Sequence, residues 1–475
     1  MDTDVLIVGA GPTGLTLGID LARRGVAALV VERADGLFPG SRGKGLQPRT
    51  MEVFDDLGVL DAVLAAGGTY PVGMIWRDGR RVGEHQMFDA DEQAEGAQGE
   101  GTQEGAGAPY TGPWMVPQWR TQEILRARLA ELGGRIVFGR EVTGVEQDAE
   151  GVTVRCADGS ALRARYAVAA DGGRSALRRA LGTGMTGETV DPRPALVADV
   201  RISGLDREHW HIFPPDGEDG GFLALCPLAG TEDFQLTAQF PEDTAVDVSA
   251  DAVRKVVAAR SHLAAEDVTE VRWASEFRPR AALADRFRAE RVFLAGDAAH
   301  VHSPAGGQGL NTSVQDAYNL GWKLGAVLAG GAPEALLDTY EEERRPIAAE
   351  VLGLSTRVHR GEVRRGTATT GQLGLGYRES SLATETRHAP GPVRAGDRAP
   401  DAVVDGVRLF DAFRGPHWTL LAPHRPAGLP QEVRTTPVPP SYGTGLFLVR
   451  PDGYVGWAGD TEEGLVEYLA GCGAA

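Results

Sequence analysis

The chain has 475 residues, 42% of them hydrophobic, which is long enough for two or three domains with cores of their own. Its 48 basic and 66 acidic residues give a net charge of −18, which repels nucleic acid and anionic membrane surfaces. No apolar run reaches the length of a membrane span, and no signal-peptide pattern precedes the first strand-like segment. We therefore expect a cytoplasmic protein without nucleic-acid or membrane partners, and the composition leaves a homo-oligomer open.

Residues 4–33, DVLIVGAGPTGLTLGIDLARRGVAALVVER, open with a nucleotide-binding pattern. The apolar run at residues 5–8 is typical of a strand buried on both faces of a parallel sheet. Gly9, Gly11 and Gly14 then match G-x-G-x-x-G. In that pattern the first glycine allows a tight turn, the second lets the backbone approach a pyrophosphate, and the third lets a helix pack closely on the strand.

The elements that follow these glycines complete the pattern. We expect a helix over residues 13–24 that ends at Gly25 and directs its first N–H groups toward phosphates. A second strand, residues 27–31, ends at Glu32, whose carboxylate is placed to accept hydrogen bonds from a ribose. An acid there disfavours a 2′-phosphate, so the pattern predicts NAD or FAD and does not choose between them.

The middle of the chain alternates helices and strands. A glycine-rich acidic stretch at residues 89–109 predicts a mobile loop. The other expected elements are helices near residues 51–57 and 118–132, and strands at residues 74–76, 81–85, 135–138, 143–147, 152–156 and 161–169.

Further along, residues 192–277 show strand alternation around one helix at residues 251–260, which predicts an inserted sheet domain. A buried strand near residue 293 and a mainly helical stretch at residues 309–363 follow. Prolines and glycines near Gly391 indicate a boundary before the last part of the chain. Cys156, Cys226 and Cys472 show no metal-ligand or CxxC spacing, so we expect reduced thiols and no metal.

Three motifs together resemble the class A single-component flavoprotein monooxygenases that hydroxylate aromatic rings. They are the glycine pattern with Glu32, D-G-x-x-S-x-x-R at residues 171–178, and GDAAHVHSPAGGQGLN at residues 296–311. With their flanking helices they span residues 4–346. The resemblance selects FAD over NAD, because an NAD dehydrogenase has no need of the second and third motifs.

The resemblance also implies roles for single residues. Asp297 follows a strand and can bind a polyol hydroxyl, here the FAD ribityl chain, while the glycine-rich segment 304–311 collects N–H groups where a reduced flavin gathers negative charge. Simpler interpretations stay open, with Asp297 and Asp171 as helix caps, the glycines as a turn, and Arg42 and Gln118 as surface groups. The expected cofactor residues are Gly9, Gly11, Pro12, Thr13, Gly14, Glu32, Arg33, Arg42, Gln118, Asp171, Gly172, Asp297, Pro304, Gly307, Gly309, Leu310 and Asn311.

The implied reaction uses NAD(P)H to reduce FAD, after which O2 adds to form a C4a-hydroperoxide that transfers oxygen to an electron-rich aromatic carbon. No second glycine pattern is present for the pyridine nucleotide, so transient docking is expected, and NADPH is favoured by family habit alone. A bulky phenol or polycyclic quinone of polyketide type is the expected substrate. Single-ring phenol hydroxylation, Baeyer–Villiger insertion, antibiotic inactivation and a non-catalytic flavin-binding scaffold remain alternatives.

We expect the substrate between the inserted sheet and the flavin. Strand alternation places His209 and His211 on one face and Trp210 on the other. His300 and His302 are explained by packing near the flavin, and no catalytic base is assigned. The candidates for lining the substrate also include Phe88, His209 and Trp210. The expected substrate-lining residues chosen from this set are Trp76, Trp114, His211, Phe213, Phe222, Leu225 and Pro304.

The expected fold class is α/β with three domains. Residues 1–190 and 278–390 form a Rossmann-like FAD-binding domain with a parallel sheet. Residues 191–277, helped by residues 72–116, form a mixed or antiparallel substrate sheet. Residues 391–475 resemble a thioredoxin-like domain that lacks CxxC, with strands at 446–449 and 454–457 paired across a turn and a role in packing or oligomerisation.

Overall fold

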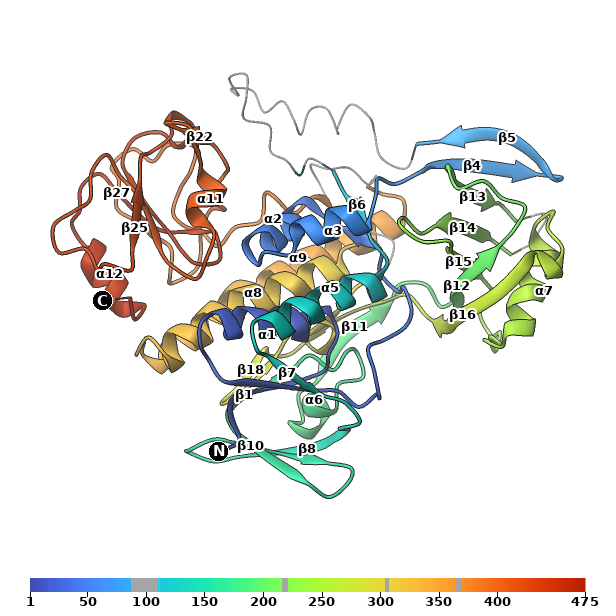
Figure 1. The fold of residues 1–475 in the computed structure, drawn as a ribbon, viewed down its shortest axis with the longest axis horizontal. Coiled ribbons are helices and arrows are strands. Elements are labelled where there is room, and N and C mark those ends of the chain that lie inside the picture. The colour runs from blue at the N-terminus through green and yellow to red at the C-terminus, as the bar shows by residue number, and fades with distance from the viewer. Residues whose placement is uncertain (87–109, 111, 216–220, 304–306, 364–369, 475) are drawn as a thin grey trace.

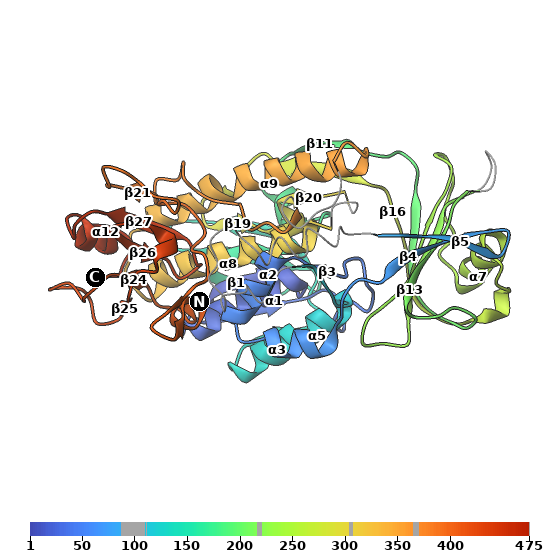
Figure 2. The same cartoon turned by 90° about the horizontal axis from the view of Figure 1, so that it is seen from above.

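The computed structural model describes residues 1–475 except 87–109, 111, 216–220, 304–306, 364–369 and 475. The acidic stretch predicted as a mobile loop, residues 89–109, therefore lies entirely outside the described residues, as do Phe88 and Pro304. Figures 1 and 2 show a helix-covered central sheet, with a second sheet at one end of the long axis and the C-terminal domain at the other. No helix in the described ranges is long and apolar enough to cross a membrane.

The central sheet runs in the order β18-β19-β10-β1-β2-β7, and β9 and β8 extend it from β10. The neighbours of β1, together with the pairs β10–β19 and β2–β7, are parallel. Val5, Leu6 and Ile7 are fully buried, which confirms a strand covered on both faces. The strands are β1 Thr3–Val8, β2 Ala28–Val31, β7 Arg135–Val137, β8 Val142–Gln147, β9 Val152–Cys156, β10 Ala161–Ala169, β18 Arg288–Ala289 and β19 Val292–Leu294.

Helices pack on this sheet, and α1 lies between α8 and α5. The long helix α8 runs through the core, as the burial of its residues from Asn311 to Gly325 shows. The helices are α1 Pro12–Arg23, α2 Pro48–Asp56, α3 Leu60–Ala66, α5 Gln118–Glu131, α6 Ala176–Ala180, α8 Gly309–Leu328 and α9 Thr339–His359, with the short 3-10 helices η2 Gly296–Ala298 and η4 Glu334–Asp338.

The second sheet is antiparallel except for the parallel pair β13–β4, and its order is β16-β12-β15-β14-β13-β4-β5. One face packs on α7 Ala250–Arg260, which covers the side turned away from the central sheet in both views. The strands are β4 Val72–Arg77, β5 Arg80–His85, β12 Ala195–Ile202, β13 His209–Phe213, β14 Leu223–Pro227, β15 Phe234–Gln239 and β16 Val268–Phe277; the 3-10 helix η1 Ala265–Asp267 precedes β16.

Smaller sheets join these bodies. The order β11-β17-β20 and the pair β3–β6 connect the central sheet with the second sheet. Their strands are β3 Gly45–Leu46, β6 Trp114–Met115, β11 Met185–Thr189, β17 Arg280–Ala284 and β20 His300–Val301.

The C-terminal domain is a five-stranded sheet in the order β21-β27-β26-β24-β25. Strands β26 and β27 pair antiparallel, as the sequence predicted for residues 446–457. Its elements are β21 Thr384–Glu385, β22 Val403–Val404, β23 Val407–Arg408, α11 Leu409–Phe413, β24 Thr419–Leu421, β25 Arg434–Thr436, η5 Pro440–Tyr442, β26 Leu446–Val449, β27 Val455–Gly459 and α12 Leu465–Gly471.

Candidate functional site

Four parallel strands of the central sheet end side by side. Val8 is in register with Val31 and with Ala169, and Ala169 is in register with Leu294. Because parallel strands bring their carboxyl ends to one edge, the residues just beyond these ends converge there. Those residues include Gly9, Glu32, Asp171 and Asp297.

The glycine turn after β1 forms a narrow cradle. Gly9 has φ +111°, and a β-carbon there would lie 2.3 Å from the carbonyl oxygen of Ala170, so only glycine is accommodated. A β-carbon on Gly14 would lie 2.0 Å from the carbonyl oxygen of Gly9, which is the close approach of α1 to β1. Gly11 meets no atom within 4 Å of such a β-carbon, so its backbone borders open space.

The Glu32 carboxylate is fixed at the end of β2. Its Oε2 accepts the backbone N–H of Ala10 at 2.9 Å, and its Oε1 accepts that of Ala34 at 3.1 Å. These bonds orient the carboxylate beside the glycine turn, and both Glu32 and Arg33 line the cavity described below. An acid held in this position can receive ribose hydroxyls through its remaining lone pairs.

Asp297 lies beyond β19, where its side chain is exposed to the cavity although protein encloses it. This desolvation raises its carboxyl pKa, while the charges of His300 and Arg42 oppose the rise. The Arg42 guanidinium stacks over Phe38 at 5.0 Å and over Trp273 at 5.9 Å, which holds its charge at the cavity wall. Within the described chain, no backbone N–H donates to the Asp297 carboxylate, so a helix-capping role finds no support.

A buried charge network supports the chain after η2. Asp316 on α8 accepts the Gly296 N–H at 3.0 Å, lies 2.5 Å from His300 Nε2 and pairs with Arg344 Nε at 2.8 Å. His300 Nδ1 in turn contacts His302 Nε2 at 2.9 Å. Since Asp316, Arg344 and His300 are fully buried, the network fixes the backbone of residues 296–302 against α8.

Asn311 organises the glycine-rich loop from behind. Its side-chain amide donates to the carbonyl oxygens of Gly45 at 2.9 Å and Gly307 at 2.8 Å, and its Oδ1 accepts the Gln47 N–H at 2.8 Å. The residue is fully buried, so it clamps two loops together instead of lining the cavity. The Asn311 side chain therefore does not line the cavity, and its assignment to the cofactor site stays a prediction.

Gln118 and Asp171 line the cavity and also form hydrogen bonds that hold neighbouring backbone in place. Gln118 Oε1 accepts the N–H of Gly43 at 3.0 Å, which ties α5 to the loop before β3. Asp171 Oδ2 accepts the Ala176 N–H at 2.6 Å and so caps α6, as the simpler interpretation held. Its Oδ1 is buried and has no partner among the described residues, so this oxygen is available to a bound group.

One cavity of about 1300 Å³ extends from the glycine turn, Glu32 and Asp297 to the second sheet. It is larger than the roughly 300–1000 Å³ usual for one small ligand, which suits a dinucleotide together with a second molecule. Gly14 and Asn311 lie behind its wall. The predicted cofactor residues that line it are Gly9, Gly11, Pro12, Thr13, Glu32, Arg33, Arg42, Gln118, Asp171, Gly172, Asp297, Gly307, Gly309 and Leu310.

The second sheet closes the far side of the cavity with the face opposite to α7. Alternation along β15 sends Phe234 and Leu236 into the core beside α7 and sends Thr237 to the cavity. On this wall the cavity is lined by Trp210, one of the wider set of sequence-based candidates. The lining residues that were not predicted are Ala195, Val197, Ala224, Gln235, Thr237, Gln239, Trp273, Ser275 and Phe277, joined by Tyr70 from the chain before β4. The alternation visible in FQLTAQF, residues 234–240, was the signal that could have found three of them.

Most of the expected substrate residues lie elsewhere. Phe222 lines the cavity, whereas His211, Phe213 and Leu225 do not and are buried in the sheet. The Trp76 indole N–H donates to His211 Nδ1 at 3.0 Å, away from the cavity. The reason is strand parity: His211 and Phe213 share a face, and that face is opposite to the one carrying Trp210.

Trp114 also lies outside the cavity. Its indole N–H donates to the carbonyl oxygen of Val63 at 3.2 Å, which secures β6 against α3. Pro304 lies outside the described residues. In the described part of the chain no group of three or more His, Cys, Asp or Glu side chains is arranged to hold a metal ion, and the three cysteines are buried and unpaired.

The residues around the cavity fit FAD. The open space at Gly11 lies where α1 begins, and the N–H groups at a helix N-terminus attract phosphate. Glu32 and Asp297 present two separate carboxylates suited to the hydroxyls of a ribose and of a ribityl chain. Gly307 and Gly309 border the cavity where α8 begins, so its N-terminal dipole faces the same space.

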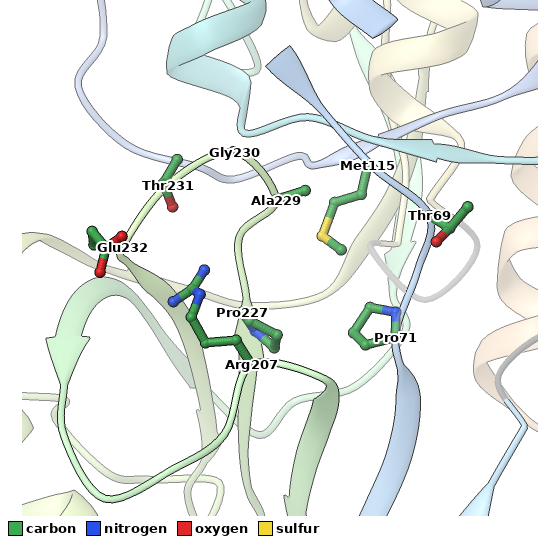
Figure 3. Close-up of a pocket in the computed structure, with 9 residues that line it drawn as sticks. All are labelled: Thr69, Pro71, Met115, Arg207, Pro227, Ala229, Gly230, Thr231 and Glu232. Carbon is green, nitrogen blue, oxygen red and sulfur yellow. The ribbon is translucent and has the colours of Figure 1, made fainter. Parts of the chain in front are cut away.

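A second, smaller pocket of about 350 Å³ is lined on one side by residues next to Tyr70 in the chain before β4 (Figure 3). Thr69, Pro71, Met115 and Arg207 are among its lining residues. The Arg207 guanidinium donates to carbonyl oxygens, one of them Leu228 O at 3.0 Å, so its hydrogen-bonding capacity is largely used by the backbone. The larger cavity is therefore the candidate site.

Comparison with known proteins gives a consistent result over nearly the full chain. The model of the FAD binding domain family matches residues 2–355. A flavin-dependent monooxygenase of Mycobacteroides abscessus is 48% identical over 98% of this chain and 99% of that protein. A rifampicin monooxygenase of Streptomyces venezuelae is 34% identical over 98% of this chain and 97% of that protein. The structure of aklavinone-11 hydroxylase with FAD and aklavinone aligns with a TM-score of 0.82 and 30% identity, covering 99% of each chain.

Proposed function

The chain belongs to the FAD binding domain family and is a flavin-dependent monooxygenase, and from this premise we propose that it hydroxylates a flat, polycyclic aromatic substrate bearing phenol or quinone oxygens. The single observation that carries the proposal is the continuity of the cavity. The nucleotide cradle at Gly11 and the sheet wall at Trp210 border one space, so a bound flavin and a substrate share it without a barrier.

The sheet wall has the composition that such a substrate needs. Tyr70, Trp210, Phe222, Trp273 and Phe277 offer wide aromatic surfaces for stacking. Thr237 and Gln239 stand among them on β15, and their polar groups can meet ring oxygens while the aromatic side chains keep water away. Apolar walls with a few placed polar groups favour a fused-ring molecule over a small, freely turning phenol.

The chain's own residues supply binding, orientation and exclusion of water. When bound, FAD supplies the redox chemistry that activates O2. Glu32, the N-terminus of α1 and Asp297 would hold the cofactor, and Asn311 keeps the loop at Gly307 in place. The buried Asp316 network keeps Asp297 and its neighbours from shifting when charge develops nearby.

Several finer features belong to the same proposal. We propose NADPH as the reductant, docking transiently, since the only glycine pattern recognised in the sequence is used by FAD. Location in the cytoplasm remains part of the proposal. The relatives support antibiotic hydroxylation as the second candidate, because one of them is a rifampicin monooxygenase over nearly its full length.

The test is a panel of candidate substrates added to the FAD-loaded protein. Aklavinone and 1-hydroxyanthraquinone represent polycyclic substrates, phenol and resorcinol represent single rings, and rifampicin represents the second candidate. We expect the polycyclic compounds to accelerate NADPH oxidation and to gain one oxygen atom by mass spectrometry. Acceleration by rifampicin alone supports antibiotic hydroxylation, and a product that hydrolyses as an ester indicates Baeyer–Villiger insertion. NADPH oxidation that ignores every compound would overturn the proposal in favour of a flavin-binding scaffold.

A further inference from the structure

Ser303, His359 and Asp191 lie close together at the cavity, beside the glycine-rich loop and the wall formed by the second sheet. Ser303 follows β20, and its Oγ lies 3.0 Å from Nδ1 of His359, the last residue of α9. The other ring nitrogen, His359 Nε2, lies 3.6 Å from Asp191 Oδ2. Three segments distant in sequence therefore contribute one group each to a continuous polar chain.

Both Ser303 and His359 line the cavity, and they differ in their access to solvent. Ser303 is fully buried, whereas 21% of the His359 side chain is exposed. The row of polar groups thus begins at the buried Ser303 on the cavity wall and leads to His359, from which a proton can leave to solvent. This is the arrangement that proton transfer out of a closed site requires.

Asp191 is held as a charged anchor behind the histidine. It accepts the backbone N–H of Arg193 at 2.9 Å, pairs with the Arg193 guanidinium and accepts the amide of Gln239 at 2.8 Å. The hydrogen bonds from Arg193, which outweigh the opposing effect of burial, lower the pKa of Asp191 to about 2. Gln239 lines the cavity, so Asp191 is fixed to the substrate wall.

The charged anchor sets the proton positions along the chain. Asp191 is ionised above its pKa and only accepts, so the ring nitrogen facing it, Nε2 of His359, carries the hydrogen in the neutral imidazole. Nδ1 is then the acceptor, and the Ser303 hydroxyl donates to it. A second proton arriving at Nδ1 would place a positive imidazolium 3.6 Å from the Asp191 carboxylate.

We propose that Ser303 and His359 form the relay that removes the phenolic proton of the bound substrate, with Asp191 as the positioning residue. The inference rests on the proposed function and assigns to it the base that sequence reasoning left open. The substrate O–H bond breaks as its proton passes to Ser303 Oγ, and the proton of Ser303 passes to His359 Nδ1. The phenol becomes a phenolate, which is the more electron-rich form for oxygen transfer, and His359 becomes an imidazolium that releases its proton to solvent.

Two further ionisable residues are sequence neighbours of the relay. Arg360, the next residue, is paired with Glu188 at 3.0 Å and is exposed. His302, which precedes Ser303, is half-buried, and desolvation together with the charge of His300 holds its pKa well below the usual range, so it stays neutral. Among the described residues, the ion-pair partner of His359 is Asp191, which is itself paired with Arg193.

The decisive experiment follows the ionisation of a bound phenol instead of turnover. Alizarin, a hydroxyanthraquinone whose visible absorption changes on ionisation, is bound to the FAD-loaded protein and titrated with pH. His359→Asn keeps an amide at the position of Nδ1 and so preserves a hydrogen bond to Ser303, but it cannot take up a proton. Ser303→Ala removes the first member of the relay while leaving the histidine in place.

The matched control is His209→Asn, because His209 Nδ1 also faces a carboxylate, Asp206 Oδ1 at 2.8 Å, but does not line the cavity. We expect bound alizarin to ionise about one pH unit higher in the His359 and Ser303 variants than in the wild type, and at the wild-type pH in the control. Turnover of a phenol by these two variants should fall at least about tenfold, with flavin reduction by NADPH unchanged.

The outcomes separate the two proposals. Identical ionisation of alizarin in all proteins, with NADPH oxidation still stimulated, overturns the relay and leaves the proposed function intact. Failure of every phenol to stimulate the wild type overturns both. A shift in the control as large as that in His359→Asn would show a general effect of losing a histidine and would also overturn the relay.

Discussion

The carboxylate of Asp297 illustrates how a single residue is prepared for a ligand. Protein encloses it, its pKa is raised by desolvation, and the nearby charges of His300 and Arg42 oppose the rise. A carboxylate in such surroundings gains from hydroxyl donors that replace the missing water. The position thus favours a polyol, and the strength of the preference can be measured.

Replacing Asp297 by Ala should weaken FAD binding by tens-fold, because a charge-assisted hydrogen bond contributes about 1.5–3 kcal/mol. The measurement is a fluorescence titration of the apoprotein with FAD. Asp297→Asn is the control that keeps shape and polarity without the charge, and it should lie between the wild type and Asp297→Ala. Equal affinities in all three proteins would remove Asp297 from the cofactor site.

Asp199 on β12 is a buried acid with a different consequence. Burial raises its pKa to about 6, Asp233 adds to the rise, and Ser41 and Lys44 oppose it. Its ordinary value is 3.8, so between about pH 4 and pH 6 the folded state binds a proton that the unfolded state has released. The contribution of Asp199 to the free energy of unfolding therefore falls as the pH rises through this window, by up to about 1.4 kcal/mol per pH unit.

Asp199→Asn has no such proton. The difference in free energy of unfolding between this variant and the wild type should therefore rise in favour of the variant from about pH 4 to about pH 6 and stay constant above about pH 6. Urea unfolding of both proteins at several pH values measures the difference. Curves for the two proteins that run parallel across this range would mean that the folded state does not shift the Asp199 pKa.

At the scale of elements, the junction of β1 and α1 contains two glycines with different roles, one in helix–strand packing and one beside the cavity. A methyl group on Gly14 would collide with the backbone of Gly9, whereas Gly11 has open space and a φ of −76°, which alanine adopts freely. We expect Gly14→Ala to lower the free energy of unfolding by about 2 kcal/mol or more, since the clash pushes the helix from the strand. Gly11→Ala should keep the stability of the apoprotein and lose FAD affinity.

Thermal unfolding of both apoproteins, followed by FAD titration, distinguishes these effects. A stable Gly14→Ala protein would show that α1 can move away from β1 at little cost. Undiminished FAD affinity in Gly11→Ala would place the pyrophosphate away from this turn.

These elements also show what the sequence could and could not predict. The buried run of β1, the helix that ends before Gly25 and the pairing of β26 with β27 follow from local patterns, and the structure confirms them. Alternation along β13 correctly separated His211 from Trp210, but it could not say which face meets α7. Which face is buried depends on packing between distant segments. The prediction of His211 as a substrate-lining residue therefore fell on the buried face.

The candidate site shows the same division. The positions of Glu32 and Asp297 at the cavity could be predicted because each follows directly after a strand of the parallel sheet, whereas their contacts with the cofactor stay a prediction. The role of the Asn311 side chain in clamping two loops could not be predicted, because its partners at Gly45 and Gln47 lie far away in sequence. The approach of Ser303 to His359 has no sequence signal, since 56 positions separate the two residues.

At the scale of the whole molecule, the C-terminal domain lies at the end opposite to the second sheet (Figures 1 and 2). A buried ion network fastens it to α8 and α9. Arg450 binds Glu343 through two bonds of 2.5 and 2.9 Å and also pairs with Asp452, while Lys323 reaches Glu343 at 2.7 Å. All four side chains are essentially inaccessible to solvent, so each charge depends on its partners.

Arg450→Met should therefore lower the free energy of unfolding by about 3–5 kcal/mol, because it leaves Glu343 and Asp452 buried with fewer partners. The control is Arg378→Met, which breaks the pair with Asp397 on the surface, where the Arg378 side chain is 53% exposed, and should cost at most about 1 kcal/mol. Chemical unfolding measures both. FAD affinity of the folded Arg450 variant should match the wild type, because the network lies away from the cavity lining. If the two variants lose equal stability, the domain is held mainly by its apolar contacts around Trp322 and Trp418.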